Sequence, residues 1–133
     1  MKNKLLRQVV TVLLTACIIL LSVVSLQPED GWNVKRGHTQ YILNGKPVTG
    51  WQFIEGSRYY FRDDGALCTG WQTIDGNRYY LNTDGSLAIG WLELAGQHYY
   101  LGTDGVCVSG WQEIGGERYC FDTDGALLTG IIL

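Results

Sequence analysis

The sequence has few of the residues that carry catalytic or metal-binding chemistry. Its 133 residues include only two histidines, His38 and His98, and neither stands at a metal-ligand spacing. It contains no glycine-rich phosphate loop leading into a helix and no nucleophile elbow. The segment 122–125 lacks the remaining ligands and the terminal Glu of a calcium loop. We therefore predict no catalytic residues, no metal and no cofactor, and we expect that the chain is not an enzyme.

Cysteines are too few, and unsuitably spaced, for a metal site. Cys17 lies in an N-terminal apolar run, which leaves Cys68, Cys107 and Cys120. Three is an odd number, so at least one of these thiols has no intramolecular disulfide partner. Each stands at a repeat position filled elsewhere by small, apolar or tyrosine residues. We interpret them as packing residues and leave their pairing open.

Positive charge is scarce beyond the first residues. The formal net charge is −3, and residues 1–25 hold three basic residues and no acid, so the remainder carries −6. A protein that binds nucleic acid needs clustered Lys and Arg side chains for its phosphate contacts. This balance argues against nucleic acid as a partner.

Residues 1–25 have the pattern of a targeting segment. A basic start precedes an almost entirely apolar run from Val9 to Val24, for which we expect a signal helix. Cleavage after Ser25 would release a secreted protein, whereas the length of the run also suits an uncleaved anchor, the one expected contact with a membrane. A lipoprotein signal at Cys17 is disfavoured because the chain stays apolar after it. Residues 26–30 form a short polar linker.

An internal repeat dominates the rest of the chain, residues 31–133. The unit at 71–90 reads WQTIDGNRYYLNTDGSLAIG and recurs with a period of twenty residues, which indicates stacked supersecondary units. Residues 131–133 form an apolar tail that either covers the last unit or marks a fragment of a longer protein. The units are a degenerate copy at 31–50 and closer copies at 51–70, 71–90, 91–110 and 111–130.

Each unit is predicted to be a β-hairpin. The Asp-Gly pair at 75–76 is a strong signal for a two-residue type I′ turn. This turn pairs Trp71 with Tyr80 on one face and Gln72 with Tyr79 on the other. Because a lone hairpin is marginally stable in water, the fold class predicted is all-β, a solenoid of stacked β-hairpins with about 20 residues per repeat.

A second Asp-Gly turn ends the second strand of each hairpin, at 84–85 in the unit 71–90. Leu87 follows this turn, and Leu67 and Leu127 follow its equivalents. Cys107 takes the same position in the unit 91–110. We expect these side chains to plug the core between hairpins.

Trp and Tyr side chains repeat on one hairpin face, and they are the candidate ligand-binding residues. A Trp ring with its polar N–H suits stacking on sugar rings or holding a quaternary ammonium, although the same rings could form the core of the solenoid. The opposite face is interpreted as core, filled by Tyr59, Tyr79, Tyr99 and Tyr119. Cross-strand Glu93–His98 and Glu113–Arg118 pairs are predicted on the candidate face. The candidates, with the basic residues of that face, are Trp51, Arg58, Tyr60, Trp71, Arg78, Tyr80, Trp91, His98, Tyr100, Trp111 and Arg118.

The pattern GWQ-x-I-x-G-x-R-YY-[FL]-x-x-DG-x-L-x-TG resembles the cell-wall-binding repeats. These include choline-binding modules of surface proteins, glucan-binding repeats of glucosyltransferases and carbohydrate-binding repeats of clostridial toxins. The resemblance covers residues 51–130 well and 31–50 loosely. It implies a β-solenoid with ligands between successive units. It also implies a non-catalytic attachment role, in a protein secreted by a bacterium or held at its cell surface or cell wall.

Choline-binding members carry an aromatic cage, and this sequence departs from it. By motif position the second cage Trp falls on Arg58, Arg78, His98 and Arg118. An Arg repels a trimethylammonium group but donates hydrogen bonds to hydroxyls, carboxylates or phosphates. We therefore expect a cell-wall or surface glycan, or an anionic envelope polymer, and disfavour a choline-decorated polymer. The alternatives are a structural stalk or adhesin without ligand sites, and the binding portion of a wall hydrolase without its catalytic domain.

Overall fold

The computed structural model describes Lys4, Gln8 and residues 28–129. The predicted signal or anchor at 1–25 therefore lies outside the described residues except for Lys4 and Gln8, which are helical. The apolar tail at 131–133 also lies outside them. Within the part of the chain that is described, no helix is both long enough and apolar enough to span a membrane.

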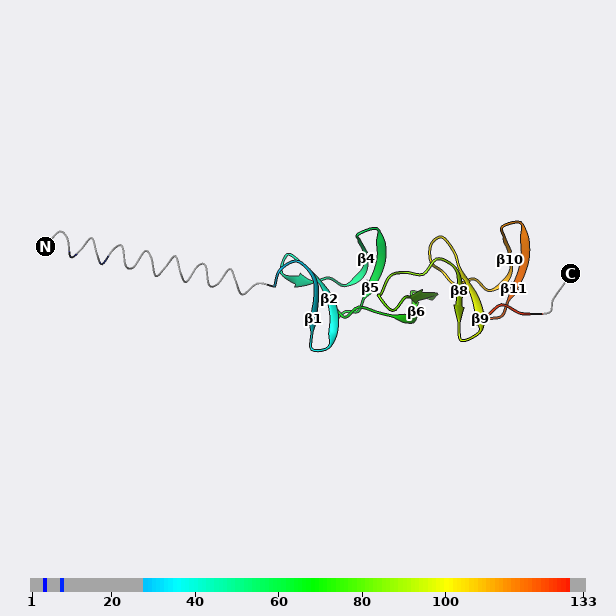
Figure 1. The fold of residues 1–133 in the computed structure, drawn as a ribbon, viewed down its shortest axis with the longest axis horizontal. Coiled ribbons are helices and arrows are strands. Elements are labelled where there is room, and N and C mark those ends of the chain that lie inside the picture. Colours follow the sequence, from blue (N-terminus) through cyan, green and yellow to red (C-terminus); the bar gives the residue numbers. More distant parts are fainter. Residues whose placement is uncertain (1–3, 5–7, 9–27, 130–133) are drawn as a thin grey trace.

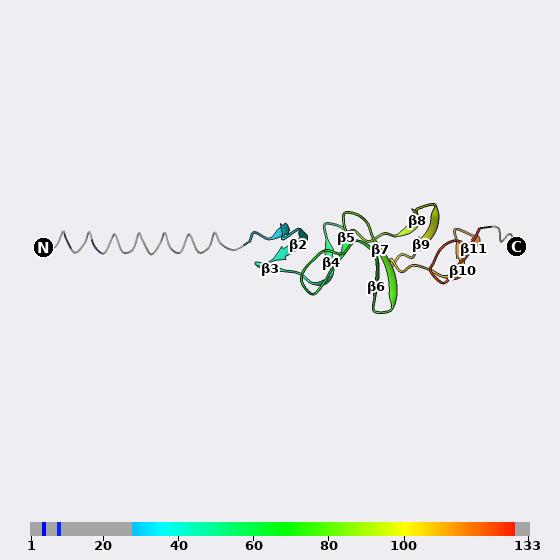
Figure 2. The same ribbon diagram turned by 90° about the horizontal axis from the view of Figure 1, so that it is seen from below.

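Residues 28–129 form a row of antiparallel hairpins that follow one another along a single axis (Figure 1; Figure 2). The first unit is a three-stranded sheet in the order β1-β2-β3, and each later unit is a separate two-stranded sheet. This arrangement confirms the predicted all-β stack of hairpins. The strands are β1 (Gly31–Lys35), β2 (His38–Leu43), β3 (Lys46–Pro47), β4 (Gly50–Ile54), β5 (Ser57–Phe61), β6 (Gly70–Ile74), β7 (Asn77–Leu81), β8 (Gly90–Leu94), β9 (Gln97–Leu101), β10 (Gly110–Ile114) and β11 (Glu117–Phe121).

The turn chemistry sets the hairpin register as predicted. Asp75 and Gly76 both have positive φ, 50° and 80°, which is the geometry of a type I′ turn. Strand β6 consequently pairs with β7 so that Trp71 lies opposite Tyr80 and Gln72 opposite Tyr79. The other repeats have the same register, so Trp and Tyr share one face in each hairpin.

The first unit is atypical because its second turn is shorter. Asn44 and Gly45 form a two-residue turn with φ of 53° and 73°, and the chain returns beside β2 as β3. In later units the loop between the second strand and the next hairpin closes through a single bridge, such as Leu81 with Leu87.

Contacts between successive units follow the same period. The backbone amide of Leu87 donates to the carbonyl of Arg58 in the preceding hairpin at 2.8 Å, and Cys107 donates to Arg78 in the same way. The side chain of Leu67 packs against the turn glycine Gly85 of the next unit, since a Cβ placed there would lie 2.5 Å from Leu67 Cδ2. Leu87 and Cys107 pack in the same way against Gly105 and Gly125. Three of the four predicted side chains thus fill the space between hairpins, and the buried strand ends of the core are Phe61, Leu81, Leu101 and Phe121.

Candidate functional site

Three aromatic rings meet at each junction between hairpins. At the third hairpin, Trp71 contacts Tyr80 of its own hairpin with ring centroids 5.2 Å apart and Tyr99 of the next hairpin at 4.9 Å. Both contacts are edge-to-face, an arrangement that aromatic rings prefer. We name each cluster by its tryptophan. The clusters are Trp32 with Tyr41 and Tyr59, Trp51 with Tyr60 and Tyr79, Trp71 with Tyr80 and Tyr99, and Trp91 with Tyr100 and Tyr119.

The second tyrosine of each cluster corrects the sequence-based interpretation. The sequence predicts a core on the opposite face, but its four tyrosines are only half-buried: Tyr59, Tyr79, Tyr99 and Tyr119. That face of one hairpin is turned toward the Trp of the hairpin before it, so these rings complete the clusters. The adjacent Tyr-Tyr pair of most units indicates rings on both faces of the hairpin, because successive side chains of a strand point to opposite faces.

The arginines of the candidate face lie on the tryptophan rings. The guanidinium carbon of Arg78 is 3.9 Å from the centroid of Trp71, and that of Arg58 is 4.6 Å from the centroid of Trp51. Arg118 lies 5.0 Å from Trp111. A cation over a Trp face is stabilised by the ring quadrupole, by about 0.5–1 kcal/mol at an exposed site. The chain thus places its own cation where a cationic ligand would bind.

Among the described residues, no arginine lies over Trp32 or Trp91 in this way. The strand register places Thr39 at this position in the first hairpin and His98 at it in the fourth. Both clusters have a fourth ring, since Phe61 lies 6.0 Å from Trp32 and Phe121 lies 5.9 Å from Trp91. Both tryptophans are open to solvent, with exposed fractions of 41% and 46%. We call these two the open clusters. Sequence reasoning missed the first because its unit is degenerate.

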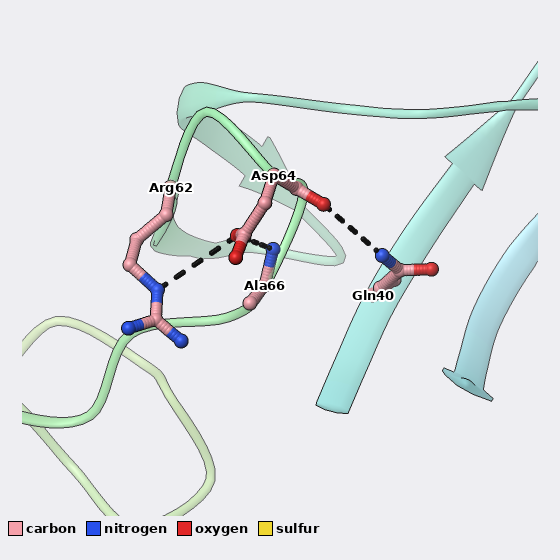
Figure 3. A network of polar contacts seen from close by, with 4 residues as sticks. All are labelled: Gln40, Arg62, Asp64 and Ala66. Carbon is pink, nitrogen blue, oxygen red and sulfur yellow. Dashed lines mark hydrogen bonds and ion pairs between the residues drawn. The ribbon is translucent and has the colours of Figure 1, made fainter. Parts of the chain in front are cut away.

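The predicted cross-strand ion pairs are wrong. Glu113 and Arg118 are register neighbours, as are Glu93 and His98. Within the described ranges, however, the ion pair that forms is Arg62–Asp64 at 3.8 Å, in a turn (Figure 3). Arg118 instead lies over its tryptophan. Attraction to the ring competes successfully because an exposed ion pair gains little in water.

The last described cluster is incomplete. Trp111 lies opposite Cys120, the residue that replaces tyrosine in this unit, and is 44% exposed. The strand register places the other candidate residues on one face of their own hairpin, as predicted. Each complete cluster also contains a tyrosine from the following hairpin.

Three titratable groups outside the clusters have shifted pKa values. Burial raises the pKa of the Cys68 and Cys107 thiols, in keeping with their interpretation as packing residues. The Ser86 hydroxyl and amide donate to the Asp84 carboxylate at 2.6 and 2.9 Å and lower its pKa. Asp84 thereby stabilises the second Asp-Gly turn.

Profiles of two repeat families match most of the repeat region. A choline-binding repeat matches residues 68–109, and a putative cell wall binding repeat matches 49–67 and 109–127. No curated protein matches the chain in a sequence search.

Solved structures give the same result. Choline-binding protein F from Streptococcus pneumoniae is 30% identical, with a TM-score of 0.74 over 77% of this chain and 39% of that one. That protein was also crystallised in the presence of a peptidoglycan analogue. The choline-binding domain of Streptococcus pneumoniae Spr1274 is 34% identical, with a TM-score of 0.55 over 62% of this chain and 96% of that domain. The present chain thus spans about two fifths of the longer relative.

These matches are at odds with the expectation that a choline-decorated polymer is disfavoured as the ligand. The argument from arginine applies to the clusters of Trp51, Trp71 and Trp111, where the guanidinium covers the ring. It does not apply to the open clusters, which have four aromatic rings each and, within residues 28–129, no arginine or lysine over the tryptophan. His98 is therefore not equivalent to the arginines, and the degenerate first unit supplies a second cluster without arginine among the described residues.

Proposed function

Because the chain belongs to the family of choline-binding, cell-wall-binding repeats, we propose that it is a non-catalytic module that attaches to choline-bearing polymer of a bacterial envelope. Attachment takes place at the open clusters of Trp32 and Trp91. A glycan or anionic polymer segment beside the choline contacts the arginines of the other clusters.

The Trp91 cluster is the observation that carries this proposal. Its tryptophan is 46% exposed, and Tyr100, Tyr119 and Phe121 lie within 5.0–5.9 Å of it, centroid to centroid. A quaternary ammonium has no hydrogen to donate, so its recognition depends on apolar contact and on the negative faces of aromatic rings. The cluster supplies both.

The arginine-covered clusters suit different chemistry. Their tryptophan faces are already occupied by a cation, so a second cation is excluded there by charge and by space. The guanidinium groups of Arg58 and Arg118 are exposed and can donate several hydrogen bonds to sugar hydroxyls or phosphates. These clusters therefore extend the contact with a polymer once choline is bound.

The proposal is tested by binding of the full-length protein to choline–agarose and to purified choline-containing cell walls. The double variant Trp32→Ala/Trp91→Ala removes both open clusters, and Trp51→Ala/Trp71→Ala is the matched control with the same loss of two rings. We expect the first variant to pass through the resin and the second to be retained and released by free choline.

Two results would contradict the proposal. Equal retention of both double variants would show that the open clusters are not the choline sites. If a single Trp91→Ala change abolished the β-sheet circular dichroism signal, the rings would be structural core, as expected of a stalk. A folded variant that no longer binds distinguishes attachment from this alternative.

A further inference from the structure

The first unit differs from the others in charge as well as in shape. Residues 31–50 hold Lys35, Arg36 and Lys46 and no acid, a charge of +3. Residues 51–129 hold eleven acidic and four basic residues, a charge of −7. A terminal repeat needs a polar outer face, but either sign of charge provides one. The positive sign in an otherwise acidic body therefore requires a separate reason.

The cationic side chains gather around a hollow. A surface hollow of about 470 Å³ lies between the tip of the β1–β2 hairpin and the turn of the next unit, and we call it the N-terminal hollow. The side chains of Lys35, Arg36 and His38 are all exposed. The hollow is lined by Lys35, Arg36, His38, Gln40, Pro47 and Asp64.

The strand register shows that polar residues of the first unit line the hollow at positions where the next unit has other side chains. Lys35 and His38 form the pair that closes the first hairpin turn, where the next unit has Ile54 and Ser57. Gln40 pairs with Asn33 at the position where Tyr59 pairs with Gln52. A buried isoleucine and a ring are thus replaced by a lysine and an amide.

Asp64 contributes its backbone to the hollow more than its charge. Its carboxylate accepts from the Ala66 amide at 3.0 Å and pairs with Arg62, while its carbonyl accepts from Gln40 Nε2 at 3.3 Å. Figure 3 shows the carboxylate directed away from Gln40. The cations on the rim are therefore not neutralised by this acid.

Gln40 is a buried amide whose oxygen lacks a partner. It is 9% exposed, and its Oε1 has no hydrogen-bond donor within residues 28–129. Figure 3 shows Oε1 pointing away from Asp64, while Nε2 makes only the long bond to its carbonyl. A buried acceptor without a donor is unfavourable, so a ligand hydroxyl that reached Oε1 would gain a hydrogen bond.

We propose that the N-terminal hollow binds the phosphate of a polyol phosphodiester, as a site separate from the aromatic clusters. Lys35 and Arg36 neutralise the phosphate, His38 donates a hydrogen bond, and Gln40 accepts one from a neighbouring hydroxyl. This chemistry occurs both in glycerol-phosphate polymers and in the phosphatidylglycerol headgroup.

The test uses the full-length protein in a non-ionic detergent and a soluble glycerol-phosphate oligomer as the probe, with binding followed by calorimetry. Lys35→Glu/Arg36→Glu reverses two charges of the hollow, and Lys46→Glu reverses one charge of the same unit that is not part of its lining. We expect the double variant to lose affinity at least tenfold and Lys46→Glu to lose less than threefold. Gln40→Leu should remove the preference for the oligomer over inorganic phosphate.

The source of the phosphate is distinguished by sedimentation with choline-free vesicles of phosphatidylglycerol and phosphatidylethanolamine at 1:3, in which the unaltered protein is compared with Lys35→Glu/Arg36→Glu. Binding of vesicles without binding of the oligomer would assign the lipid headgroup. Equal losses in Lys46→Glu and the double variant, or no binding of either probe, would overturn the proposal. Retention on choline–agarose should be unchanged in every variant, so failure here is separable from failure of the open clusters.

Discussion

Substituting Gly85 by alanine tests how neighbouring hairpins are held together. Gly85 has φ of 85°, and a Cβ there would lie 2.5 Å from Leu67 Cδ2 and 2.8 Å from its Cγ. Gly76 has nearly the same φ, 80°, but no atom lies within 4 Å of its would-be Cβ. Gly76→Ala should therefore cost only the left-handed backbone strain, about 1–2 kcal/mol. Gly85→Ala should add an overpacking cost of about 1–3 kcal/mol.

The free energy of unfolding can be measured by urea denaturation followed by tryptophan fluorescence, with equal m-values as the check that the same structure unfolds. A double-mutant cycle with Leu67→Ala isolates the contact. In the Leu67→Ala background the overpacking disappears, and Gly85→Ala should cost about the same as Gly76→Ala, roughly 1–2 kcal/mol.

Two results would refute this account of the junction. Gly85→Ala and Gly76→Ala could prove equally costly within about 0.5 kcal/mol, the usual error of additivity. Alternatively, the cost of Gly85→Ala could be unchanged by Leu67→Ala. Either outcome would mean that Leu67 does not fill the space between units and that backbone hydrogen bonds hold the hairpins.

The other predictions concern single groups. Arg78→Met, made in a Trp91→Ala background, should uncover Trp71 and so increase the change in tryptophan fluorescence that free choline causes. If the change in fluorescence did not increase, the guanidinium would not be what blocks the ring. Ser86→Ala should raise the pKa of Asp84 toward its ordinary value in an NMR titration, and the stability supplied by this carboxylate, present at neutral pH, is lost as pH falls through its lowered pKa. The Cys68 thiol, whose pKa is raised by burial, should react with iodoacetamide at pH 8 more slowly than in urea.

Local structure could be predicted from the sequence because it depends on neighbouring residues. The turn at 75–76 is set by residues that tolerate positive φ, and a two-residue turn leaves a single register for the strands. The alternation of side chains then determines that Trp71 and Tyr80 share a face. The position of Leu87 between hairpins can be predicted from the same twenty-residue period.

The composition of the binding clusters could not be predicted, because it depends on how one hairpin is rotated against the next. The sequence of a single unit shows that Tyr99 and Tyr100 lie on opposite faces, but not that Tyr99 meets Trp71 of the preceding unit. The second face would be core only in a stack with flat, fully covered faces. The actual stack leaves those rings half-buried at the junctions.

The rotation between successive hairpins also determines where the two clusters without arginine lie on the solenoid. Figure 1 shows the hairpins β1–β2 and β8–β9 pointing to one side of the axis and β4–β5 and β10–β11 to the other. The first and fourth hairpins carry Trp32 and Trp91, the tryptophans without arginine. The two open clusters therefore belong to hairpins that point to the same side. A single polymer that runs along the solenoid could occupy both, and two modest affinities on one strand multiply through effective concentration.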